Sequence, residues 1–343
     1  MRFKEFSGEW EKCKIGQILK IKSGKDQKAI EKPIGKYNIY GTGGIIGKTD
    51  SFLYDKESIG IGRKGTIDRP FYFNQPFWTV DTLFYSYIKV EYCVKFIYYL
   101  FETINWKMYD ESTGVPSLSS STIESIGVYI TDKKEQKKIA TFLTLIDKRI
   151  ETQMKIIEET KSLIQNIKNK VIENSIFVKW IKINDICTIK TGKLDANALK
   201  ENGKYKFFTC SKDDYYINEY AFDGEALIIS GNGELGLIKY YNGKFNAYQR
   251  TYVLQNFKLS PIYIKFMMEY YLPRKIYKEK NVGAMPYIVL STIAELEIPV
   301  VDNRIIEKME QLYLLFNKRQ NIDNIQLNNL KKQKQFLLNN MFI

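Results

Sequence analysis

The clearest pattern along the chain is a seven-residue repeat of apolar positions within residues 132–177, a stretch without glycine or proline. A repeat of this period predicts a long α-helix that buries one seam against a partner helix. Asp132 followed by Glu135 predicts the start of this helix, as an N-cap residue and its capping-box partner. The seam residues expected from the two interleaved rows are Leu143, Ile146, Ile150, Ile157, Ile164 and Ile167.

A second helical stretch covers residues 302–343, where asparagine, glutamine and lysine fill the positions between apolar residues. Two long half-apolar helices each need a partner, and an antiparallel pairing is expected because a whole domain separates them. For residues 132–177 the alternative is a long surface helix packed on its own domain, although their 46 residues exceed the ordinary length of a globular helix. The apolar positions of the second stretch are Ile305, Met309, Leu312, Leu315, Ile322, Ile325, Leu330 and Leu337.

The remaining sequence, residues 10–131 and 180–301, contains short β-type runs broken by glycine turns. Each region also has one amphipathic candidate helix, near 91–105 and near 262–278. These patterns predict an α+β fold with two similar mixed α/β domains and two long α-helices that form an antiparallel coiled coil. The expected boundaries are 1–131 for the first mixed domain, 132–178 for the central helix, 179–301 for the second mixed domain and 302–343 for the C-terminal helix.

The two mixed domains share a frame of short motifs at an offset of 168 to 170 residues, although most residues between these anchors differ. A duplication that keeps its frame and varies its interior indicates one scaffold that carries two different readers. The anchors pair Trp10 with Trp180, Ser23-Gly24-Lys25 with Thr191-Gly192-Lys193, Gly114-Val115-Pro116 with Gly283-Ala284-Met285-Pro286, Ser121-Thr122-Ile123 with Ser291-Thr292-Ile293, and Lys148-Arg149 with Lys318-Arg319.

Composition narrows the chemistry and the partners. The chain has no histidine, which excludes histidine general bases, histidine triads and histidine metal sites. Its four cysteines are far apart with no Cys-x-x-Cys, so neither a zinc site nor a disulfide framework is indicated. No apolar run has the length of a membrane span, and no secretory signal is expected, so a reducing cytoplasm is the expected setting. The net charge of +13 favours a nucleic-acid partner, although a coding bias toward lysine would also produce it.

The start of the long helix resembles a known family. Residues 132–150 read D-K-K-E-Q-K-K-I-A-T-F-L-T-L-I-D-K-R-I, which resembles the conserved central helix of type I restriction–modification specificity subunits. Tyr40–Gly47 looks like the opening of a target recognition domain in that family, where a tryptophan commonly opens each domain, as Trp10 and Trp180 do here. The resemblance covers nearly the whole chain. The second copy departs from it, with Ile305-Ile306, Met309-Glu310 and Asn317 in place of Glu135-Gln136, Ile139-Ala140 and Asp147.

The resemblance implies a subunit that performs no chemistry and needs no cofactor of its own. Each recognition domain would read one half of a split site in double-stranded DNA. The long helices would hold the halves apart and dock methyltransferase subunits, which carry S-adenosylmethionine. A nuclease–translocase subunit would join for restriction, and no membrane partner is expected.

Two strings approach enzyme motifs without completing them. Gly43–Thr49 nearly makes a phosphate-binding loop, but the required first glycine is Thr42. Asn74–Trp78 comes within one residue of the Asn-Pro-Pro-aromatic motif of amino-methyltransferases, and Gln75 breaks it. No compact group of carboxylates indicates a metal nuclease. A self-contained methyltransferase or nuclease is therefore disfavoured, and a coiled-coil interaction protein without a DNA role stays open.

The best candidates for DNA contact are glycine loops that carry donor side chains. In Gly62–Thr66, an arginine and a lysine are placed to pair with guanine or to hold phosphate. Its counterpart is Ser230–Glu234, in which Asn232 suits adenine. For any single residue, a solvated structural turn is an equally open interpretation. The full set of candidates is Lys25, Thr42, Arg63, Lys64, Thr66, Lys193, Ser211, Lys212, Asn232, Gln249 and Arg250.

Overall fold

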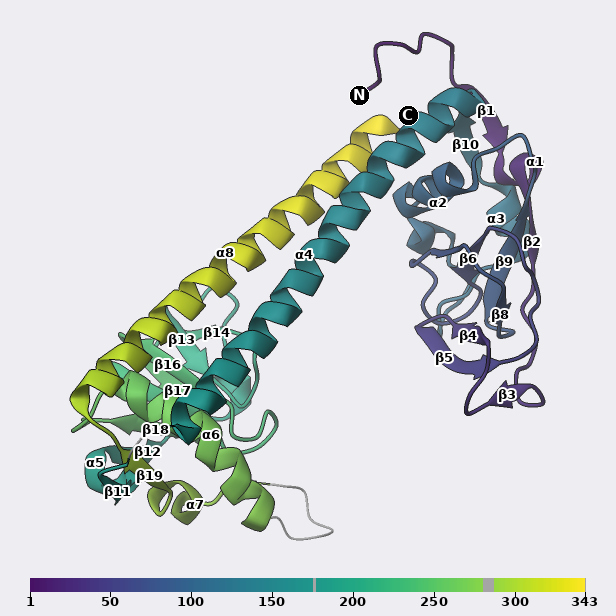
Figure 1. Ribbon diagram of the computed structural model, residues 1–343. Helices are drawn as coiled ribbons and strands as arrows, with labels where there is room; N and C mark the ends of the chain where they lie inside the picture. The colour runs from purple at the N-terminus through teal and green to yellow at the C-terminus, as the bar shows by residue number, and fades with distance from the viewer. Residues whose placement is uncertain (175–176, 280–286, 343) are drawn as a thin grey trace. The chain divides into compact units, whose positions relative to one another are not determined.

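The computed structural model describes residues 1–174, 177–279 and 287–342. These residues form two compact units, which we call unit 1 (Met1–Lys155 with Asn324–Ile343) and unit 2 (Ile156–Asp323). Each unit holds one mixed domain and one segment from each of two long helices (Figure 1). The second copy of the glycine–proline anchor, Gly283–Pro286, lies outside the described residues.

The mixed domain of unit 1 is built on two four-stranded sheets. The antiparallel sheet has the order β2 (Leu19–Lys22), β9 (Leu83–Ile88), β6 (Ser58–Gly62), β7 (Phe71–Phe73). The other sheet has the order β3 (Glu31–Lys32), β5 (Gly44–Thr49), β4 (Tyr37–Gly41), β8 (Phe77–Thr79), and its last two strands run parallel. A separate antiparallel pair joins β1 (Glu11–Lys14) to β10 (Gly127–Ile130). The helical segments are α1 (Ile15–Ile18), α2 (Val94–Thr103), η1 (Trp106–Tyr109) and α3 (Ser120–Ser125).

The mixed domain of unit 2 repeats this plan. Its antiparallel sheet has the order β12 (Thr188–Thr191), β18 (Thr251–Gln255), β15 (Glu225–Ser230), β16 (Ile238–Asn242). Its second sheet has the order β14 (Tyr215–Ile217), β13 (Tyr205–Phe208), β17 (Phe245–Ala247), again with a parallel last pair. The joining pair is β11 (Lys179–Lys182) with β19 (Glu297–Val300). The helical segments are α5 (Ile183–Ile186), η2 (Ala196–Ala198), α6 (Pro261–Glu279) and α7 (Leu290–Ala294).

The sequence duplication is therefore a duplication of fold. The antiparallel sheets have the same strand order, both second sheets contain a parallel pair, and both domains join their first and last strands. The helices predicted near 91–105 and 262–278 are confirmed as α2 and α6. The mixed α/β class predicted for both domains is confirmed with them.

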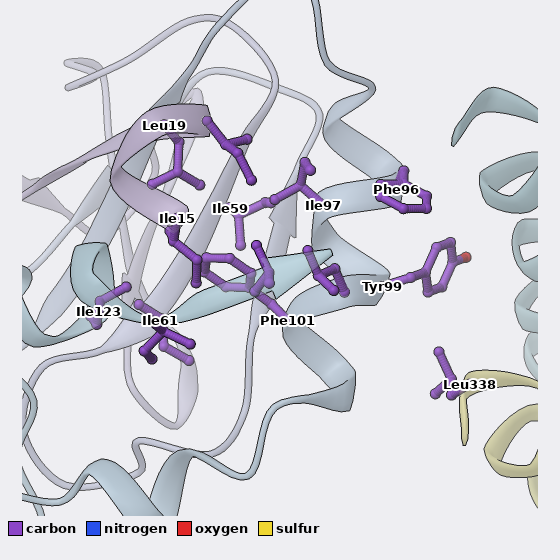
Figure 2. Packing of buried hydrophobic residues seen from close by; sticks show 14 of the residues in the cluster. Ile15, Leu19, Ile59, Ile61, Phe96, Ile97, Tyr99, Phe101, Ile123 and Leu338 are labelled. Atoms are coloured by element: carbon purple, nitrogen blue, oxygen red, sulfur yellow. The ribbon is translucent and has the colours of Figure 1, made fainter. Parts of the chain in front are cut away.

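Helix α2 connects the antiparallel sheet of unit 1 to the long helices. Ile97 and Phe101, one turn apart, pack with Ile59 of β6, and none of these three side chains is more than 1% exposed (Figure 2). Burying such a side chain contributes ~1.5–3 kcal/mol. Tyr99 projects from another face of α2 toward the long helices, where Leu338 lies (Figure 2). One helix thus belongs to two packing layers of the same core.

Both long helices are continuous, α4 over Lys133–Glu173 and α8 over Asn303–Met341. The predicted N-cap of α4 is confirmed, because Asp132 Oδ1 accepts hydrogen bonds from the backbone N–H groups of Lys134 (2.8 Å) and Glu135 (3.1 Å). Within the described residues, no helix is both long and apolar enough to cross a bilayer.

The side chain of Glu135 has partners other than the predicted capping-box bond. Arg2 donates to it from Nε and Nη2, at 2.7 Å in each case, and the hydroxyl of Thr131 donates to the same carboxylate. A bidentate bond between two charged groups is stronger than a bond to a neutral backbone N–H group. The N-terminal segment is therefore fastened to the first turn of α4.

In unit 1 the start of α4 packs against the end of α8. Leu143 and Ile146, which are 0% and 4% exposed, share one core cluster with Leu337 and Leu338. Ile150 is half-buried against the same cluster. Because the first turns of one helix meet the last turns of the other, the two helices are antiparallel in this unit.

In unit 2 the end of α4 packs with the start of α8. Ile172 of α4 shares a core cluster with Ile306 and Met309 of α8, and all three side chains are at most 8% exposed. The antiparallel arrangement predicted for the long helices is thus confirmed within each unit. The remaining expected seam residues are buried, as for Ile157 and Ile164, or half-buried, as for Ile167.

The inward row of α8 differs from the predicted pattern. Asp323, which is 1% exposed, occupies the middle of this row. Because it is charged, the seven-residue period of the row is not seen when only apolar residues are counted. The buried or half-buried positions at seven-residue spacing are Met309, Phe316, Asp323, Leu330 and Leu337. Three of the apolar positions named from the sequence are instead exposed, namely Leu315 (62%), Ile322 (41%) and Ile325 (50%).

Candidate nucleic-acid interface

In each domain two backbone segments approach closely at a glycine that is followed by a lysine. A Cβ atom on Gly24 or on Gly192 would lie 2.0 Å from a backbone carbonyl oxygen of a neighbouring segment. No other residue type fits at that distance, so glycine is what allows these segments to approach. The lysines that follow, Lys25 and Lys193, are exposed. Both predicted phosphate contacts therefore lie directly after a glycine at which the backbone is closely packed.

The backbone of the contact loop predicted in unit 1, Gly62–Thr66, is held from two sides. The N–H group of Arg63 donates to the carbonyl oxygen of Thr82 (2.8 Å), and that of Gly65 donates to the carbonyl oxygen of Pro116 (2.8 Å). Gly65 has a φ of +96°, a conformation that favours glycine. The non-glycine side chains of the loop are exposed. A fixed backbone with exposed donor side chains suits contact with a duplex.

Residues at and just after the first glycine–proline anchor, Gly114–Pro116, support this loop. Pro116 accepts from Gly65, and Leu118 donates from its N–H group to the carbonyl oxygen of Arg63 (2.9 Å). In unit 2, Ile288 donates in the same way to the carbonyl oxygen of Gly231 (2.8 Å). In unit 1, the structural role of the anchor is therefore to support the loop beside it.

Two side chains of the loop lie at one cavity. Arg63 and Lys64 line a cavity of about 530 Å³. The guanidinium group of Arg63 lies 5.9 Å from the ring centroid of Phe84, a distance at which cation–π attraction operates. The hydroxyl of Thr42 lies beside the same loop, 3.4 Å from the position that a Cβ on Gly65 would take. Four predicted contacts, Thr42, Arg63, Lys64 and Thr66, are thus brought together.

Glu111 lines the same cavity and was missed in the sequence. The hydroxyl groups of Thr122 and Ser119 donate to its carboxylate and hold the pKa of Glu111 below its ordinary value. A carboxylate that stays ionised can accept a hydrogen bond from the amino group of cytosine. The one available signal was its position three residues before the anchor that begins at Gly114.

The corresponding loop of unit 2 has an equivalent backbone contact and different side chains. The N–H group of Gly231 donates to the carbonyl oxygen of Arg250 (3.0 Å), with both partners 168 positions after the Arg63–Thr82 pair. Asn232 follows directly and is half-buried. By the same offset, Gly231 takes the place of Arg63 and Asn232 takes that of Lys64, with the backbone of Arg250 beside them.

Two further predicted residues lie beside the unit 2 loop. Glu234 donates from its backbone N–H group to Cys210 (3.0 Å), next to the segment that holds Ser211 and Lys212. Lys212 forms an ion pair with Glu234 at 3.1 Å. The hydroxyl of Ser211 lies 3.2 Å from the carboxylate of Asp213, so it takes part in a local turn.

The last candidate of unit 2 lies at the glycine–lysine pair. Gln249 donates from its backbone N–H group to the carbonyl oxygen of Leu194 (2.9 Å), which places it beside Lys193. Each unit thus offers two places for a duplex, a glycine–lysine pair and a glycine loop, and every predicted contact falls at one of them.

One protein-family model matches both halves of the chain. The model of the type I restriction modification DNA specificity domain matches residues 7–162 and again residues 178–336. The chain belongs to this family of type I specificity proteins. The family resemblance expected from the central helix and the opening tryptophans is confirmed.

Individual relatives agree with this assignment. The type I restriction enzyme EcoDI specificity subunit of Escherichia coli is 39% identical over 142 residues, which are 39% of this chain and 31% of that subunit. A putative type I specificity subunit of Mycoplasma genitalium is 23% identical over an alignment that covers 97% of this chain and 94% of the relative. The chain thus spans less than a third of the E. coli subunit and nearly all of the M. genitalium protein.

Solved structures share the fold. The crystal structure of the type I restriction–modification S subunit from M. genitalium matches with a TM-score of 0.67 and 21% identity, over 98% of this chain and 96% of that chain. A chain from a study of complex assembly and conformational transition of the type I system matches with a TM-score of 0.57 and 11% identity, over 96% of both chains. These likenesses show the fold. The family model, which describes a DNA specificity domain, is what confirms the expected function at the level of the family.

Proposed function

We propose that this chain is the non-catalytic DNA-reading subunit of a type I restriction–modification complex. Residues 1–131 and 179–301 are its two recognition domains, and each reads one half of a bipartite site. One observation carries the proposal. The loops at 62–66 and 230–234 have equivalent backbone contacts but present different side chains, arginine and lysine in one and asparagine in the other. One scaffold with two different loops suits two different half-sites.

The roles of the side chains follow from their chemistry. Lys25 and Lys193, directly after the closely packed glycines, hold phosphates and supply affinity that falls with salt. Arg63 has the fork geometry that pairs with guanine, and Asn232 has the donor and acceptor that pair with adenine. Arg250, whose backbone binds the unit 2 loop at Gly231, adds a cation there. The net charge of +13 supports attraction to a polyanion.

The helix segments of unit 1 support a docking role for partner subunits. An apolar groove of about 860 Å³ lies between α4 and α8, lined among others by Phe142, Leu145 and Leu330. Leu145 is 54% exposed, so the groove is open. The repeat anchor Lys148-Arg149 lines the same groove. The partners proposed are methyltransferase subunits that carry S-adenosylmethionine, together with a nuclease–translocase subunit for restriction.

The decisive experiment is to express the chain with a methyltransferase subunit and to map methylated adenines in the cellular DNA. The expected result is one motif made of two short words separated by a spacer of fixed length. A continuous motif, or no methylation that depends on this chain, would contradict the proposal.

Two controls separate the other classes of function. The purified chain alone, incubated with DNA and either S-adenosylmethionine or Mg²⁺, is expected to leave the DNA unmodified, and activity there would identify a self-contained enzyme. Binding of the complex to DNA is expected to weaken steeply between low and physiological salt. Absence of DNA binding under all salt conditions would instead favour a coiled-coil interaction protein.

A further inference from the structure

A lysine near the end of α8 ties the first recognition domain to the long helices. In unit 1, Lys334 Nζ lies 2.9 Å from Glu102 Oε2, at the end of α2. The same ammonium lies 2.8 Å from Asp147 Oδ1 of α4 and 5.5 Å from the ring centroid of Tyr99. One cation thus connects α2 of the domain with both helix segments of the unit.

Unit 2 contains the same arrangement with different neighbours. Lys168, near the end of α4, has its Nζ 2.5 Å from Glu269 Oε2 of α6. The ammonium lies 5.4 Å from the ring centroid of Phe266. Lys265, also of α6, forms a second ion pair with Glu269. Here again, a lysine near the C-terminus of a long helix meets a glutamate on the helix that covers the domain's sheet.

The two arrangements are copies of each other in the repeat. Glu269 follows Glu102 by 167 positions, and Phe266 follows Tyr99 by the same number. Lys334 follows Lys168 by 166 positions. Glutamate, aromatic ring and lysine have therefore kept their relation in both units, although the third charged partner has changed from Asp147 to Lys265.

We propose that these two lysine–glutamate pairs, which we call clamps, are positioning residues that fix the orientation of each recognition domain on its helix segments and thereby the spacing at which the two half-sites are read. The proposal rests on the proposed function. Neither clamp belongs to the loops that would contact DNA, so their role is to hold the readers in place.

The clamps differ from the apolar contacts around them in how strictly they define geometry. The attraction between apolar side chains has no preferred direction, so it defines the orientation of a helix less strictly than a directional contact does. An ion pair with little solvent around it needs its partner at one place, because an unpaired charge there is costly. The side chains of Lys334 and Glu102 are 17% and 21% exposed, and those of Lys168 and Glu269 are 14% and 26% exposed. These charges are screened far less than exposed pairs are.

The clamp of unit 1 is expected to matter more. The first domain continues into α4 through only Thr131 and Asp132, whereas α8 follows the second domain in the sequence. Side-chain contacts such as the clamp are therefore what hold the first domain to α8. The second domain lies between α4 and α8 along the chain, so both helices are attached to it covalently.

The test uses charge reversal and its compensation in the full chain with its methyltransferase partner. The variants are Glu102→Lys and Lys334→Glu, alone and together, and Glu269→Lys and Lys168→Glu, alone and together. Each double variant keeps the number of positive and negative charges at its clamp. The matched control is Glu158→Lys, which makes the same charge change in an exposed pair with Lys161 on α4.

The measurement is the fraction of methylated adenines at sites whose spacer is one base pair longer or shorter than in the wild type. Glu102→Lys is expected to raise this fraction about tenfold, which corresponds to roughly 1.4 kcal/mol of lost discrimination. Glu269→Lys is expected to raise it less. Both double variants are expected to return it part of the way, because the exchanged charge at position 334 faces Asp147 and that at position 269 faces Lys265. Glu158→Lys is expected to leave it unchanged. Glu102→Gln is the milder variant, should the reversal prevent folding.

Loss of stability alone would lower methylation at all sites without changing the spacer distribution. An unchanged distribution in Glu102→Lys, Glu102→Gln and Glu269→Lys, with a bipartite motif in the wild type, would overturn the clamps and leave the proposed function standing. A wild-type chain that gives no bipartite motif would overturn the proposed function itself, and the spacing role with it.

Discussion

Unit 1 and unit 2 fasten the first turn of a long helix by different chemistry. In unit 1, Glu135 at the start of α4 is 0% exposed and binds Arg2 through two hydrogen bonds of 2.7 Å. The next residue, Gln136, accepts from the N–H group of Cys93 (2.9 Å) and donates to the carbonyl oxygen of Thr131 (2.7 Å). The start of α4 is thus held by polar bonds inside the unit.

Unit 2 has isoleucines at the corresponding places. Ile305 and Ile306 stand 170 positions after Glu135 and Gln136, and Ile172 stands 170 positions after Arg2. Ile172 and Ile306 belong to one core cluster, and Ile305 packs against it. Both members of the ion pair have therefore been replaced together by apolar residues that share a core.

The difference explains why the second helix departs from the family pattern. Glu135 and Gln136 are at most 1% exposed and bind groups of their own unit, so the departure at these two positions concerns internal packing rather than the surface that partners meet. A buried ion pair and a well-packed apolar pair of similar volume have similar net stability. Removal of only one partner of a buried ion pair is costly. Unit 2 differs from unit 1 at both partners, so it contains no unpaired charge at this place.

The largest expected effect comes from breaking the Arg2–Glu135 ion pair of unit 1. Glu135→Ala removes the acceptor of Arg2 and of Thr131 from a position without solvent, and it is expected to lower the free energy of unfolding of unit 1 by about 3 kcal/mol. The counterpart in unit 2, Ile305→Ala, removes only half-buried apolar surface and is expected to cost about 1 kcal/mol. Urea denaturation followed by probes in each unit gives both values.

A double variant tests whether the ion pair of unit 1 can be replaced by the apolar contact of unit 2. Arg2→Ile together with Glu135→Ile copies the residues of unit 2 into unit 1 and is expected to recover about half of the stability lost in Glu135→Ala. Recovery stays incomplete because the hydroxyl of Thr131 loses its acceptor. A double variant less stable than Glu135→Ala would show that the ion pair cannot be replaced at this place.

The next largest effect is expected from variants of the two recognition loops, and each loop is expected to act independently of the other. Arg63→Ala is expected to relax the first half of the methylated motif, and Asn232→Ala the second half, each with a loss of about 1–3 kcal/mol of discrimination at one base pair. Mapping of methylated adenines reads both halves in one experiment. If either variant changed both halves, the two domains would not be independent readers.

The features predicted from the sequence are those with a long period or a local cause. The central helix was recognisable because its apolar rows persist over many turns and Asp132 caps it locally. The glycine–lysine pairs repeat because close approach of two segments leaves room only for glycine at Gly24 and Gly192. Such features depend on residues that are close in the sequence, so they can be recognised from one sequence alone.

The features that were missed depend on partners far away in the sequence. Glu135 was assigned to a capping box because its neighbour Asp132 was visible, whereas Arg2 lies 133 positions away. The clamps were missed because a charged residue on a helix usually faces water, and because their offset of 166 to 167 differs from the 168 to 170 of the frame. In α8 the inward row was hidden by Asp323, since an apolar count treats a charged residue as outward-facing.

The clamps also distinguish the two units by their charge. In unit 1 one ammonium, Lys334, meets the two carboxylates of Glu102 and Asp147. In unit 2 one carboxylate, Glu269, meets the two ammonium groups of Lys168 and Lys265. Although burial opposes the charged form in each case, attraction to the partners raises the pKa of Lys334 and lowers the pKa of Glu269. Tyr98, which donates to Glu102, and Tyr99, whose ring faces Lys334, have phenol pKa values raised by burial and stay neutral.

The smallest predicted effect follows from these shifts and has opposite signs in the two units. The raised pKa of Lys334 gives unit 1 stability that is fully present below the ordinary lysine value of 10.5 and is lost as the pH rises through the raised value. The lowered pKa of Glu269 gives unit 2 stability that is present above 4.5 and is lost as the pH falls through the lowered value. Each contribution is expected to be about 1 kcal/mol, because the side chains retain some solvent.

Denaturation followed in each unit across the pH range measures both contributions. Lys334→Met is expected to flatten the alkaline side of the curve for unit 1, and Glu269→Gln the acid side of the curve for unit 2, with the opposite side unchanged in each. The same dependence in both units would mean that groups outside the clamps control it. Opposite dependences would show that one repeated clamp, by exchanging Asp147 for Lys265, loses its stabilising effect at the alkaline extreme in unit 1 and at the acid extreme in unit 2.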